Sequence, residues 1–306
     1  MSVSAPPART VRLPPPDPRT HAWRADLAEA ALDGIVAAPR YANGVRQRCR
    51  LARASLHQAP GADAVQVSEL LYGETVTCFE ARDGWSWVKG AHDDYVGYVT
   101  SDALVPWHGA PQASHVVSAV RAHLYRAPDV KAPISHALYA ASPLRVTGAS
   151  ADGRFLALDD GGWVSVRHAA PAACVAPDIA ETAQAFLGTP YRWGGRSGDG
   201  IDCSGLVQIA VMRAGCACPR DSDQQAASLG ADIGTDLGRL QRGDLVFFPG
   251  HVGIMADGQR LIHANATAMA VSVDPLARVI DTIRESHPDR PIVALRRLVP
   301  SERQKR

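Results

Sequence analysis

The sequence predicts a multidomain chain in which two small β-barrels precede an α+β domain. Three observations support this prediction: a length of 306 residues with 46% hydrophobic content, a diverged internal repeat in the first half, and helical patterns that come before strand-like runs in the second half. A chain of this length and composition buries a substantial core and is long enough for two or three domains.

Residues 1–48 are predicted to form an extended arm and a short helix. The first 19 residues contain six prolines and no apolar stretch typical of a signal peptide, which predicts a disordered arm without an export signal. The segment Asp26–Leu32 has a helical pattern that Gly34 would end. Without an export signal, a cytoplasmic location is expected, with the six cysteines as free thiols.

Residues 49–107 and 108–170 are predicted to be two copies of one β module. Short β-branched and aromatic runs between Gly, Asp and Pro turns indicate small β-barrels. A single irregular β domain is the alternative. The matched segments are Arg53–Pro60 with Arg121–Pro128 at an offset of 68, Leu71-Tyr72 with Leu138-Tyr139 at an offset of 67, and Asp83–Val88 with Gly161–Val166.

Residues 175–306 are predicted to form the α+β domain. Asp178 would cap its first helix, and Gly215 would end the second. The motif Ser222-x-x-Gln225 is typical of a capping box at the start of a third helix. A buried strand at Leu245–Phe248 and two further strands follow, so helices precede an antiparallel sheet.

Cys203 is the candidate nucleophile. It directly precedes the amphipathic run Leu206–Ala214, so it is expected in the first turn of a helix, where the positive end of the dipole favours the thiolate. The neighbouring Asp202 opposes this effect, because a carboxylate raises the pKa of a nearby thiol. The Cys203 N–H is expected to donate to the oxyanion of an acyl intermediate.

His251 and His263 are the candidate base and its orienting group, on consecutive strand-like segments. A three-residue hairpin loop at Ala256–Gly258 would pair Met255 with Gln259 and place the two histidines opposite each other on one face of the sheet. A two-residue loop would place them on opposite faces. With the longer loop, the thiol gains a base within hydrogen-bonding reach and a group that orients the base.

Over about residues 176–300 the sequence resembles the NlpC/P60 family of cell-wall peptidases. The resemblance rests on Tyr191-Arg-Trp-Gly-Gly195, Asp202-Cys-Ser-Gly-Leu206, Gly250-His-Val-Gly253 and the second histidine, in the family's order. It implies a papain-like core, preceded here by two bacterial SH3-like modules. The chain is most similar to γ-D-glutamyl-L-diamino acid endopeptidases of the dipeptidyl-peptidase VI type.

The resemblance also implies contacts with a free N-terminal L-Ala–γ-D-Glu dipeptide. In the resembled enzymes, residues around the cysteine hold this dipeptide, and the first SH3-like module closes one end of the cleft with an acidic residue and a tyrosine. The matching positions are Asp202, Ser204, Tyr191, Ser222, Glu74 and Tyr95. Helix capping is the alternative for Asp202 and Ser222, packing for Tyr191, and a turn role for Glu74. Arg220 would bind the D-Glu carboxylate or form a salt bridge.

The expected activity is hydrolysis of the γ-D-glutamyl–diamino acid bond of free muropeptides, in the recycling of cell-wall peptides. An exported D,L-endopeptidase or amidase acting on intact peptidoglycan is the alternative, and an inactive wall-binding adaptor is a third. No cofactor is expected, nor a metal at Cys216 and Cys218, which lack a second ligand pair. The net charge of +1 and the lack of a long apolar run predict no nucleic-acid or membrane partner.

Overall fold

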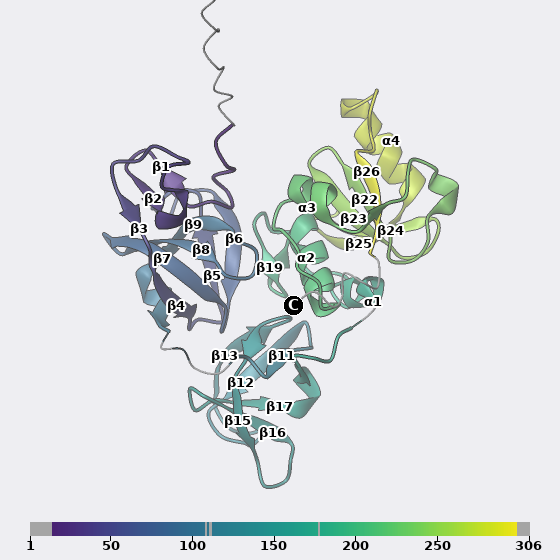
Figure 1. Cartoon of the computed structure of the whole chain (residues 1–306). Coiled ribbons are helices and arrows are strands. Elements are labelled where there is room, and N and C mark those ends of the chain that lie inside the picture. Colours follow the sequence, from purple (N-terminus) through teal and green to yellow (C-terminus); the bar gives the residue numbers. More distant parts are fainter. Residues whose placement is uncertain (1–13, 108, 110–111, 177, 299–306) are drawn as a thin grey trace, which may run out of the picture.

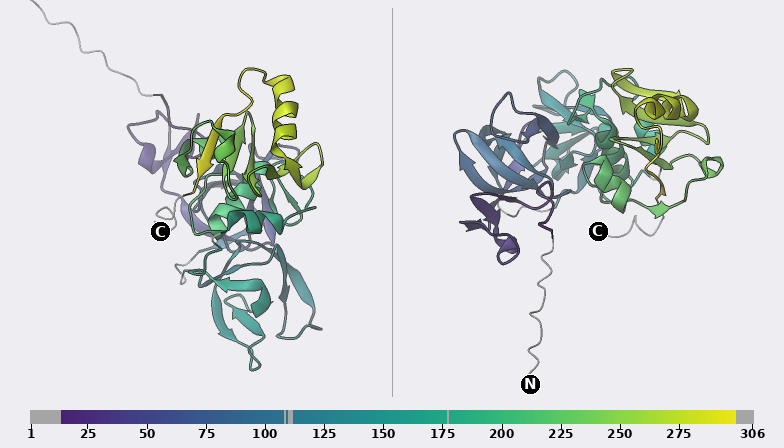
Figure 2. Two further views of the ribbon diagram at one scale, coloured as in Figure 1. Left: turned by 90° about the vertical axis from the view of Figure 1, so that its right-hand side faces the viewer. Right: turned by 90° about the horizontal axis from the view of Figure 1, so that it is seen from above.

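The computed structural model describes residues 14–107, 109, 112–176 and 178–298, which form three regions (Figure 1). A first β region, coloured purple to blue, lies beside a region of helices and sheet, coloured green to yellow, and a second β region, coloured teal, lies below them. Figure 2 shows this arrangement from the side and from above. Residues 1–13, for which disorder is predicted, lie outside the described residues.

The segment that follows residue 13 packs against two regions, which corrects the prediction of a disordered arm up to Arg19. The Arg19 guanidinium donates to Asp221 at 3.0 Å and to Asp223 at 2.8 Å, at the start of α3 (Ser222–Ser228). The Arg19 carbonyl accepts from the N–H of Val96 in the first β region. These polar contacts order a segment whose proline content alone indicates disorder.

The helix predicted at Asp26–Leu32 is wrong. The chain instead forms β1 (Trp23–Arg24), β2 (Leu27–Glu29), the 3-10 turn η1 (Ala30–Leu32) and β3 (Tyr41–Ala42). Strand β2 pairs antiparallel with β1 and parallel with β3, and all three of its residues are buried. Tertiary pairing therefore outweighs the local helix propensity of this alanine-rich segment.

The first β region is a seven-stranded sheet in the order β10-β4-β7-β8-β9-β5-β6. It begins at residue 45, a few residues before the expected boundary at 49. Its elements are β4 (Val45–Cys49), β5 (Arg53–His57), β6 (Gln66–Leu71), β7 (Thr75–Arg82), β8 (Trp85–Gly90), β9 (Val96–Thr100), the turn η2 (Ser101–Ala103) and β10 (Leu104–Pro106).

The second β region contains a five-stranded sheet in the order β13-β12-β17-β16-β15 and a three-stranded sheet in the order β14-β11-β18. The five-stranded order corresponds to β6-β5-β9-β8-β7 of the first region. The elements are β11 (His115–Val117), β12 (Arg121–Tyr125), β13 (Ile134–Tyr139), β14 (Pro143–Leu144), β15 (Val146–Ala149), β16 (Phe155–Leu158), β17 (Trp163–Ser165), η3 (Val166–His168) and β18 (Ala169–Pro171).

The register of the two regions confirms the first repeat match and corrects the other two. Arg53 pairs with Leu71, and Arg121 pairs with Tyr139, so the structural offset is 68 in both strands of the hairpin. Leu71 therefore corresponds to Tyr139 and not to Leu138. The tryptophan match is also wrong, because Trp85 lies on β8 whereas Trp163 lies on β17, the counterpart of β9.

The third region is α+β, as predicted. An antiparallel six-stranded sheet has the order β21-β26-β22-β23-β24-β25. Its helices and strands are α1 (Ile179–Gln184), β19 (Arg196–Ser197), β20 (Gly200–Ile201), α2 (Cys203–Arg213), α3, β21 (Ala231–Asp232), η4 (Leu237–Arg239), β22 (Leu245–Phe248), β23 (His251–Met255), β24 (Arg260–Asn265), β25 (Ala270–Pro275), α4 (Leu276–Ser286) and β26 (Ala294–Arg297).

The predicted helix ends of this region are largely confirmed. Asp178 caps α1 by accepting the N–H groups of Ala180 at 2.9 Å and Glu181 at 3.1 Å. Gly215 follows α2 with φ of 82°, the left-handed conformation that terminates helices. The first nine residues of α2 are all buried. One apolar core packs this helix against β23 and β24 and also against Leu71 and Tyr139 of the two β regions.

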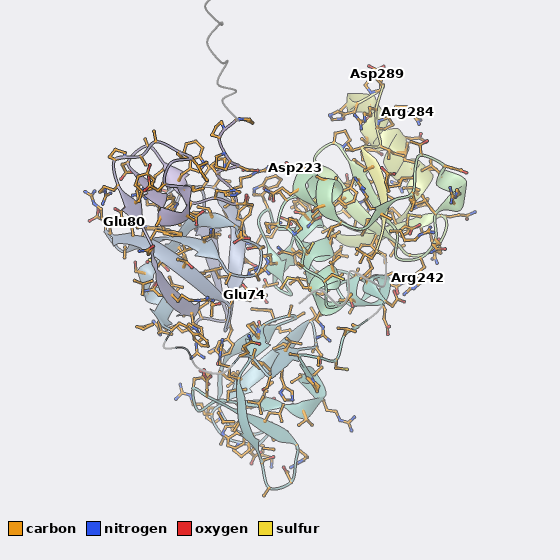
Figure 3. All side chains as sticks on the ribbon, viewed as in Figure 1. Glu74, Glu80, Asp223, Arg242, Arg284 and Asp289 are labelled. Atoms are coloured by element: carbon orange, nitrogen blue, oxygen red, sulfur yellow. The ribbon has the colours of Figure 1, made fainter. Side chains whose placement is uncertain are left out.

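A buried ion pair joins the first β region to the α+β region. Arg196 is fully buried and donates to both carboxylate oxygens of Glu74, at 3.0 and 3.1 Å. The same guanidinium donates to the Gln208 side chain of α2 at 2.5 Å and to the Glu69 carbonyl at 2.7 Å. Figure 3 shows Glu74 at the place where the three regions meet.

Replacing Glu74 with Gln should lower the free energy of unfolding by about 3–5 kcal/mol, because it leaves the Arg196 charge buried without its counter-charge. Urea unfolding followed by circular dichroism measures this change. The matched control is Glu285→Gln on the exposed side of α4, which should change stability by no more than about 0.5 kcal/mol. Equal effects of the two substitutions would contradict the structural role of the pair.

Candidate functional site

Cys203 is the first residue of α2, as predicted, and its side chain is buried. The loop before it packs tightly against the first turn of the helix. A Cβ on Gly205 would lie 2.3 Å from the carbonyl oxygen of Gly195, and a Cβ on Gly195 would lie 2.4 Å from that of Gly200. The glycines of the two sequence motifs are therefore required by close backbone approach around the thiol.

Asp202 caps the helix that begins at Cys203. One carboxylate oxygen accepts the N–H of Gly205 at 2.7 Å, and the other accepts the N–H of Gly194 at 2.8 Å. The buried Arg220 donates to both oxygens, at 3.0 and 2.6 Å, and also to the hydroxyl groups of Ser204 at 2.7 Å and Ser68 at 3.1 Å. The capping alternative for Asp202 is therefore observed. Arg220 does form a salt bridge, but a buried one and not the surface salt bridge that was the alternative for it.

The two histidines lie on one face of the sheet and contact each other. His251 Nε2 lies 2.8 Å from His263 Nδ1, and the ring centroids are 5.0 Å apart. Phe248 stacks on the His251 ring, with centroids 5.8 Å apart. The expected contact between the two histidines is therefore observed, and their roles as base and orienting group stay a prediction.

The hairpin register differs from the prediction. Met255 pairs with Leu261 and not with Gln259, and the N–H of Ala256 donates to the Arg260 carbonyl at 2.7 Å. The three-residue loop is thus shifted by one position, and the Asp257 side chain stabilises it by accepting two backbone N–H groups at 2.9 Å. The ladder moves by two residues, which preserves the face of each side chain, so the histidines are diagonal neighbours.

Asp274 of β25 completes a chain of polar groups that the sequence analysis missed. Its carboxylate lies 3.1 Å from His263 Nε2 and accepts the Ser272 hydroxyl at 2.6 Å. Ser272 pairs directly with His263 in the ladder. The alternation Ser-Val-Asp on the strand after the second histidine is a signal that could have identified this residue.

The chain of hydrogen bonds fixes the tautomers of both neutral rings. An ionised carboxylate only accepts, so the Asp274 contact assigns the proton of His263 to Nε2. His263 Nδ1 is then an acceptor, and His251 Nε2 must donate to it. The lone pair of His251 is left on Nδ1, which makes this nitrogen the available base.

The charge states differ from the expected thiolate and imidazolium. Burial raises the pKa of the Cys203 thiol to about 12, the Asp202 carboxylate adds to the shift, and nearby backbone N–H groups of Val252 and Ser204 oppose it. Burial, followed by the charge of His263, lowers the pKa of His251 to about 3. Removal from water therefore outweighs the helix dipole, and both groups are neutral at neutral pH.

The thiol and the His251 ring lie close in the fold but are not hydrogen-bonded to each other. Within the described ranges, no hydrogen bond joins Cys203 Sγ to that ring, and the sulfur faces the N–H of Val252, the next residue on β23. The expected hydrogen bond is thus absent in this state. Such contacts are often loose in enzymes without substrate and tighten when substrate binds.

Two of the remaining candidates, Tyr191 and Ser204, lie beside this centre, and a third, Ser222, begins the neighbouring helix α3. Burial, and then the charges of Cys203 and Asp202, raise the pKa of Tyr191 to about 12, which locates its phenol beside both. Ser222 begins α3, but the capping box is wrong, because Asp221 occupies the N-cap and the Gln225 side chain donates to backbone carbonyls. Ser204 follows the nucleophile and is bound by Arg220, as described above.

The two candidates from the first β region have different positions. Tyr95 reaches the start of α3, where its hydroxyl donates to Asp221 at 3.0 Å. Glu74 is instead held by Arg196 beside Gln208 and Met212, in the second half of α2. Its assignment as a substrate contact is therefore corrected, because its charge is already neutralised away from Cys203.

Two observations bear on metals and membranes. Within residues 14–298, gaps excepted, no cluster of His, Cys, Asp or Glu side chains is arranged to hold a metal ion. None of the described helices is long and apolar enough to cross a membrane.

Comparisons with known proteins agree with the resemblance seen in the sequence. Residues 188–290 match the NlpC/P60 family, and residues 56–104 match the bacterial dipeptidyl-peptidase SH3 domain. The chain is 29% identical to dipeptidyl-peptidase 6 of Lysinibacillus sphaericus over 243 residues, which cover 73% of this chain and 89% of the relative.

Two further relatives are informative. The γ-D-glutamyl-L-lysine dipeptidyl-peptidase of Bacillus subtilis is 36% identical over 113 residues, which are 34% of this chain and 37% of that protein. The crystal structure of an NlpC/P60 family protein from Bacillus cereus superposes with a TM-score of 0.69 at 22% identity, and the match covers 83% of this chain and all of that one. This last likeness concerns the fold alone.

Acid should destabilise the protein partly through His251. Because the folded pKa of about 3 lies below the ordinary value of 6.5, the unfolded chain binds more protons between these values. Stability therefore rises with pH across this window and is lost as the pH falls from 6.5 to 3, with a slope from this group approaching ~1.4 kcal/mol per pH unit. Urea unfolding of His251→Asn should show a correspondingly shallower pH dependence, and an unchanged slope would refute the buried neutral state.

Replacing Asp274 with Asn should lower the pKa of His263 further. Burial already lowers this pKa, and the Asp274 carboxylate is the group that opposes the shift. Nitrogen-15 NMR titration of the histidine rings measures both the pKa and the tautomer of His263. Asp281→Asn, on the exposed surface of α4, is the control and should leave the ring unchanged. If the His263 titration curve is the same in both variants, Asp274 is not hydrogen-bonded to His263 in solution.

Proposed function

Since this chain is a peptidase of the NlpC/P60 family that carries a bacterial dipeptidyl-peptidase SH3 domain, we propose that it releases L-Ala–γ-D-Glu from free muropeptides. The bond cleaved would be the γ-D-glutamyl–diamino acid amide. The observation that supports the proposal most directly is the series of hydrogen bonds from His251 through His263 to Asp274, in the same region as a cysteine at a helix start. The names of the relatives support the bond and the dipeptide product.

In the proposed mechanism, the Cys203 thiol attacks the amide carbonyl while its proton passes to His251 Nδ1. Throughout, His263 Nδ1 accepts a hydrogen bond from the Nε2–H of His251, and Asp274 stabilises the positive charge that develops on the two rings. The Cys203 N–H donates to the oxyanion. His251 then returns the proton to the leaving amine, and water, activated by the same nitrogen, hydrolyses the thioester.

Starting from a neutral thiol and a neutral imidazole is consistent with this mechanism. Charge separation would occur during attack, when the substrate fills the site and the carbonyl oxygen receives the negative charge. The height of the barrier would then depend on the groups that stabilise the protonated form of His251 in the transition state. Asp274 is the anion in hydrogen-bonding contact with that pair of rings.

The proposed dipeptide site surrounds the N-terminus of α2. Tyr191, Asp202 and Ser204 lie next to the nucleophile, and Ser222 begins the neighbouring helix. Asp202 is already paired with Arg220, so its proposed part is to hold the loop and the helix start that shape the site.

The substrate ammonium is assigned instead to the acidic group beside Tyr95. Asp221 keeps a quarter of its side chain exposed, accepts the Tyr95 hydroxyl, and is contacted by Arg19. Burial raises the pKa of Asp221 although Arg220 and Arg19 oppose the shift, so a further cation would stabilise its ionised form. Tyr95 comes from the module that would close this end of the cleft.

The domain organisation is part of the same proposal. The region predicted at 49–107, which begins with β4 at residue 45, would be the first SH3-like barrel, and the region at 108–170 the second. The shared strand order and the common offset of 68 support a second copy. Residues 175–306 would form the papain-like catalytic domain. An enzyme that needs a free amine would act on released wall peptides, as recycling requires.

Free L-Ala-γ-D-Glu-diaminopimelate should be cleaved after D-Glu, and the N-acetylated peptide on the order of 10–100 times more slowly in kcat/KM, because acetylation removes the charge that pairs with Asp221. Chromatography of the products measures both rates, with Cys203→Ala as the inactive reference. Tyr95→Phe should reduce the discrimination, because it removes the hydroxyl that orients the carboxylate.

Tyr98→Phe is the matched control, since the Tyr98 hydroxyl accepts from Arg24 and, among the described residues, no hydrogen bond joins it to α3. Tyr98→Phe should show the same ratio of kcat/KM between the free and the N-acetylated peptide as the unmodified protein. Equal rates of cleavage of the free and the acetylated peptides would contradict the dipeptidyl-peptidase proposal. Cleavage of intact peptidoglycan at a comparable rate would favour the wall-lytic endopeptidase or amidase.

A further inference from the structure

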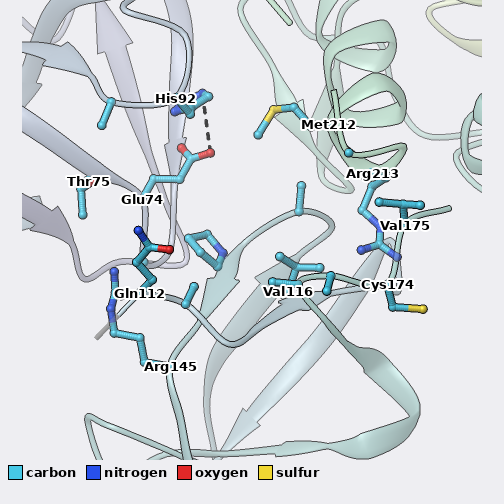
Figure 4. Close-up of a pocket in the computed structure, with 18 residues that line it drawn as sticks. Glu74, Thr75, His92, Gln112, Val116, Arg145, Cys174, Val175, Met212 and Arg213 are labelled. Atoms are coloured by element: carbon cyan, nitrogen blue, oxygen red, sulfur yellow. Dashed lines mark ion pairs between the residues drawn. The ribbon is translucent and has the colours of Figure 1, made fainter. Parts of the chain in front are cut away.

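Two cavities differ in how they relate to the histidines. The larger, of about 540 Å³, lies between the two β regions and the C-terminal end of α2, and Figure 4 shows the Glu74–His92 ion pair at its edge. Neither Cys203 nor a histidine of the site lines it. The second, of about 410 Å³, lies within the α+β region and has both His251 and His263 in its wall. Since His251 is the proposed base, this second cavity adjoins the place where the leaving amine would accept its proton.

The walls of the second cavity come from three neighbouring elements. The loop after β24 supplies residues 265–268, β25 supplies Asp274, and α4 supplies residues 278, 279, 282 and 283. The Asn265 side chain fixes the loop, because its oxygen accepts the N–H of Ala268 at 2.7 Å and its nitrogen donates to the Ser272 hydroxyl at 2.8 Å. The loop wall is thus formed without a ligand, and the volume is in the range of small-molecule sites.

Arg278 brings a positive charge to this cavity. It lies in the first turn of α4, is exposed, and is the one arginine or lysine among the described lining residues. Within residues 14–298, gaps excepted, its guanidinium donates no hydrogen bond, and no carboxylate lies within ion-pair distance of it. By contrast, Arg284 of the same helix is paired with Asp281 at 2.8 Å. The Arg278 guanidinium is therefore available to an anionic ligand.

Asp274 brings a negative charge to the same cavity. Its Oδ2 atom accepts the Ser272 hydroxyl at 2.6 Å and lies 3.1 Å from His263 Nε2. No described residue donates a hydrogen bond to its Oδ1 atom, and 29% of the side chain is exposed. The Ser272 hydrogen bond is the largest cause that lowers the pKa of this carboxyl, and the charge of Arg278 lowers it further. An ionised oxygen and a guanidinium thus face the same space.

These two opposite charges match an amino-acid end group better than a simple amine. The side chain of diaminopimelate ends in a carbon that carries both an ammonium and a carboxylate, whereas that of lysine ends in an ammonium alone. The carboxylate would bind the Arg278 guanidinium in a bidentate manner, and the ammonium would donate to Asp274 Oδ1. A lysine ammonium would gain only the contact with Asp274 and would lie near the positive charge of Arg278, which disfavours it.

We propose that this cavity holds the diamino acid that leaves on cleavage, and that Arg278 makes the protein prefer diaminopimelate to lysine. This inference rests on the proposed function, which puts the γ-D-glutamyl carbonyl at Cys203 and the leaving amine at His251. No residue assigned to the dipeptide lines the cavity, so the two halves of the substrate have separate sites. The methylene groups of the diamino acid would lie against Val279 and Ile283 of α4.

The test compares kcat/KM for free L-Ala-γ-D-Glu peptides that end in meso-diaminopimelate, in L-lysine, or in diaminopimelate amidated at its side-chain carboxylate. The first should be cleaved roughly five to ten times faster than the other two, a modest factor because Arg278 is exposed and water screens its charge. All these peptides keep the same α-carboxylate, so only the side-chain end group differs. Added salt should reduce the preference, because it screens the exposed charge.

Arg278→Gln should remove most of the preference, because it slows cleavage of the diaminopimelate peptide and relieves the repulsion of the lysine ammonium. Arg278→Lys keeps the charge without the planar pair of donors and should retain part of the preference. Arg284→Gln is the matched control on the same helix and should keep the full preference, because Arg284 does not line the cavity. Equal rates on the diaminopimelate and lysine peptides, or an equal slowing of both in Arg278→Gln, would overturn the proposal.

A binding measurement separates this inference from the proposed function. In Cys203→Ala, which cannot turn over, meso-diaminopimelate alone should shift the nitrogen-15 NMR signals of His263, which Asp274 contacts. Lysine at the same concentration should shift them less, and Arg278→Gln should abolish this difference. If no peptide is cleaved after D-Glu but these shifts occur, the proposed function fails and the assignment of the cavity stands. If cleavage after D-Glu occurs and neither rates nor shifts depend on the diamino acid, the function stands and this inference fails.

Discussion

The bidentate ion pair between Arg220 and Asp202 is the interaction on which the site depends. Asp202 lies directly before Cys203, and the pair satisfies buried groups on three sides: the helix start, the glycine loop at Gly194, and Ser68 of the first β region. A buried arginine is costly to desolvate, and its hydrogen bonds compensate for this cost only when all its partners lie in one arrangement. The pair therefore fixes the positions of the loop and the helix start more than it adds to stability. The place of Cys203 follows from it.

The Arg196–Glu74 pair is a second buried ion pair that fixes the position of its surroundings. Both arginines are almost completely buried, and both reach from the α+β region into the first β region. The first nine residues of α2 are buried, and burial is the largest cause of the shifted pKa values of Cys203 and His251. The neutral state of these two groups is thus a consequence mainly of how tightly the regions pack, with a further contribution from the neighbouring Asp202 carboxylate at Cys203.

Local patterns in the sequence predicted what depends on local structure. The helix start at Cys203, the cap at Asp178 and the shared face of the histidines follow from short-range periodicity, and the last survives a register error because a shift of two preserves the face. The ion-pair and hydrogen-bond partners that lie far apart in the sequence were not predicted: Arg220 for Asp202, Arg196 for Glu74, and Asp274 for His263. The helix expected near Asp26 failed for the same reason, because strand pairing with distant residues decided its conformation.

The sharing of buried arginines has a consequence for how such a chain can be assembled from parts in evolution. An α+β region cut free at residue 175 would carry Arg196 without the Glu74 carboxylate and Arg220 without the Ser68 hydroxyl. Joining it to a different N-terminal module would therefore require either new partners for these two arginines in that module or changes at both positions.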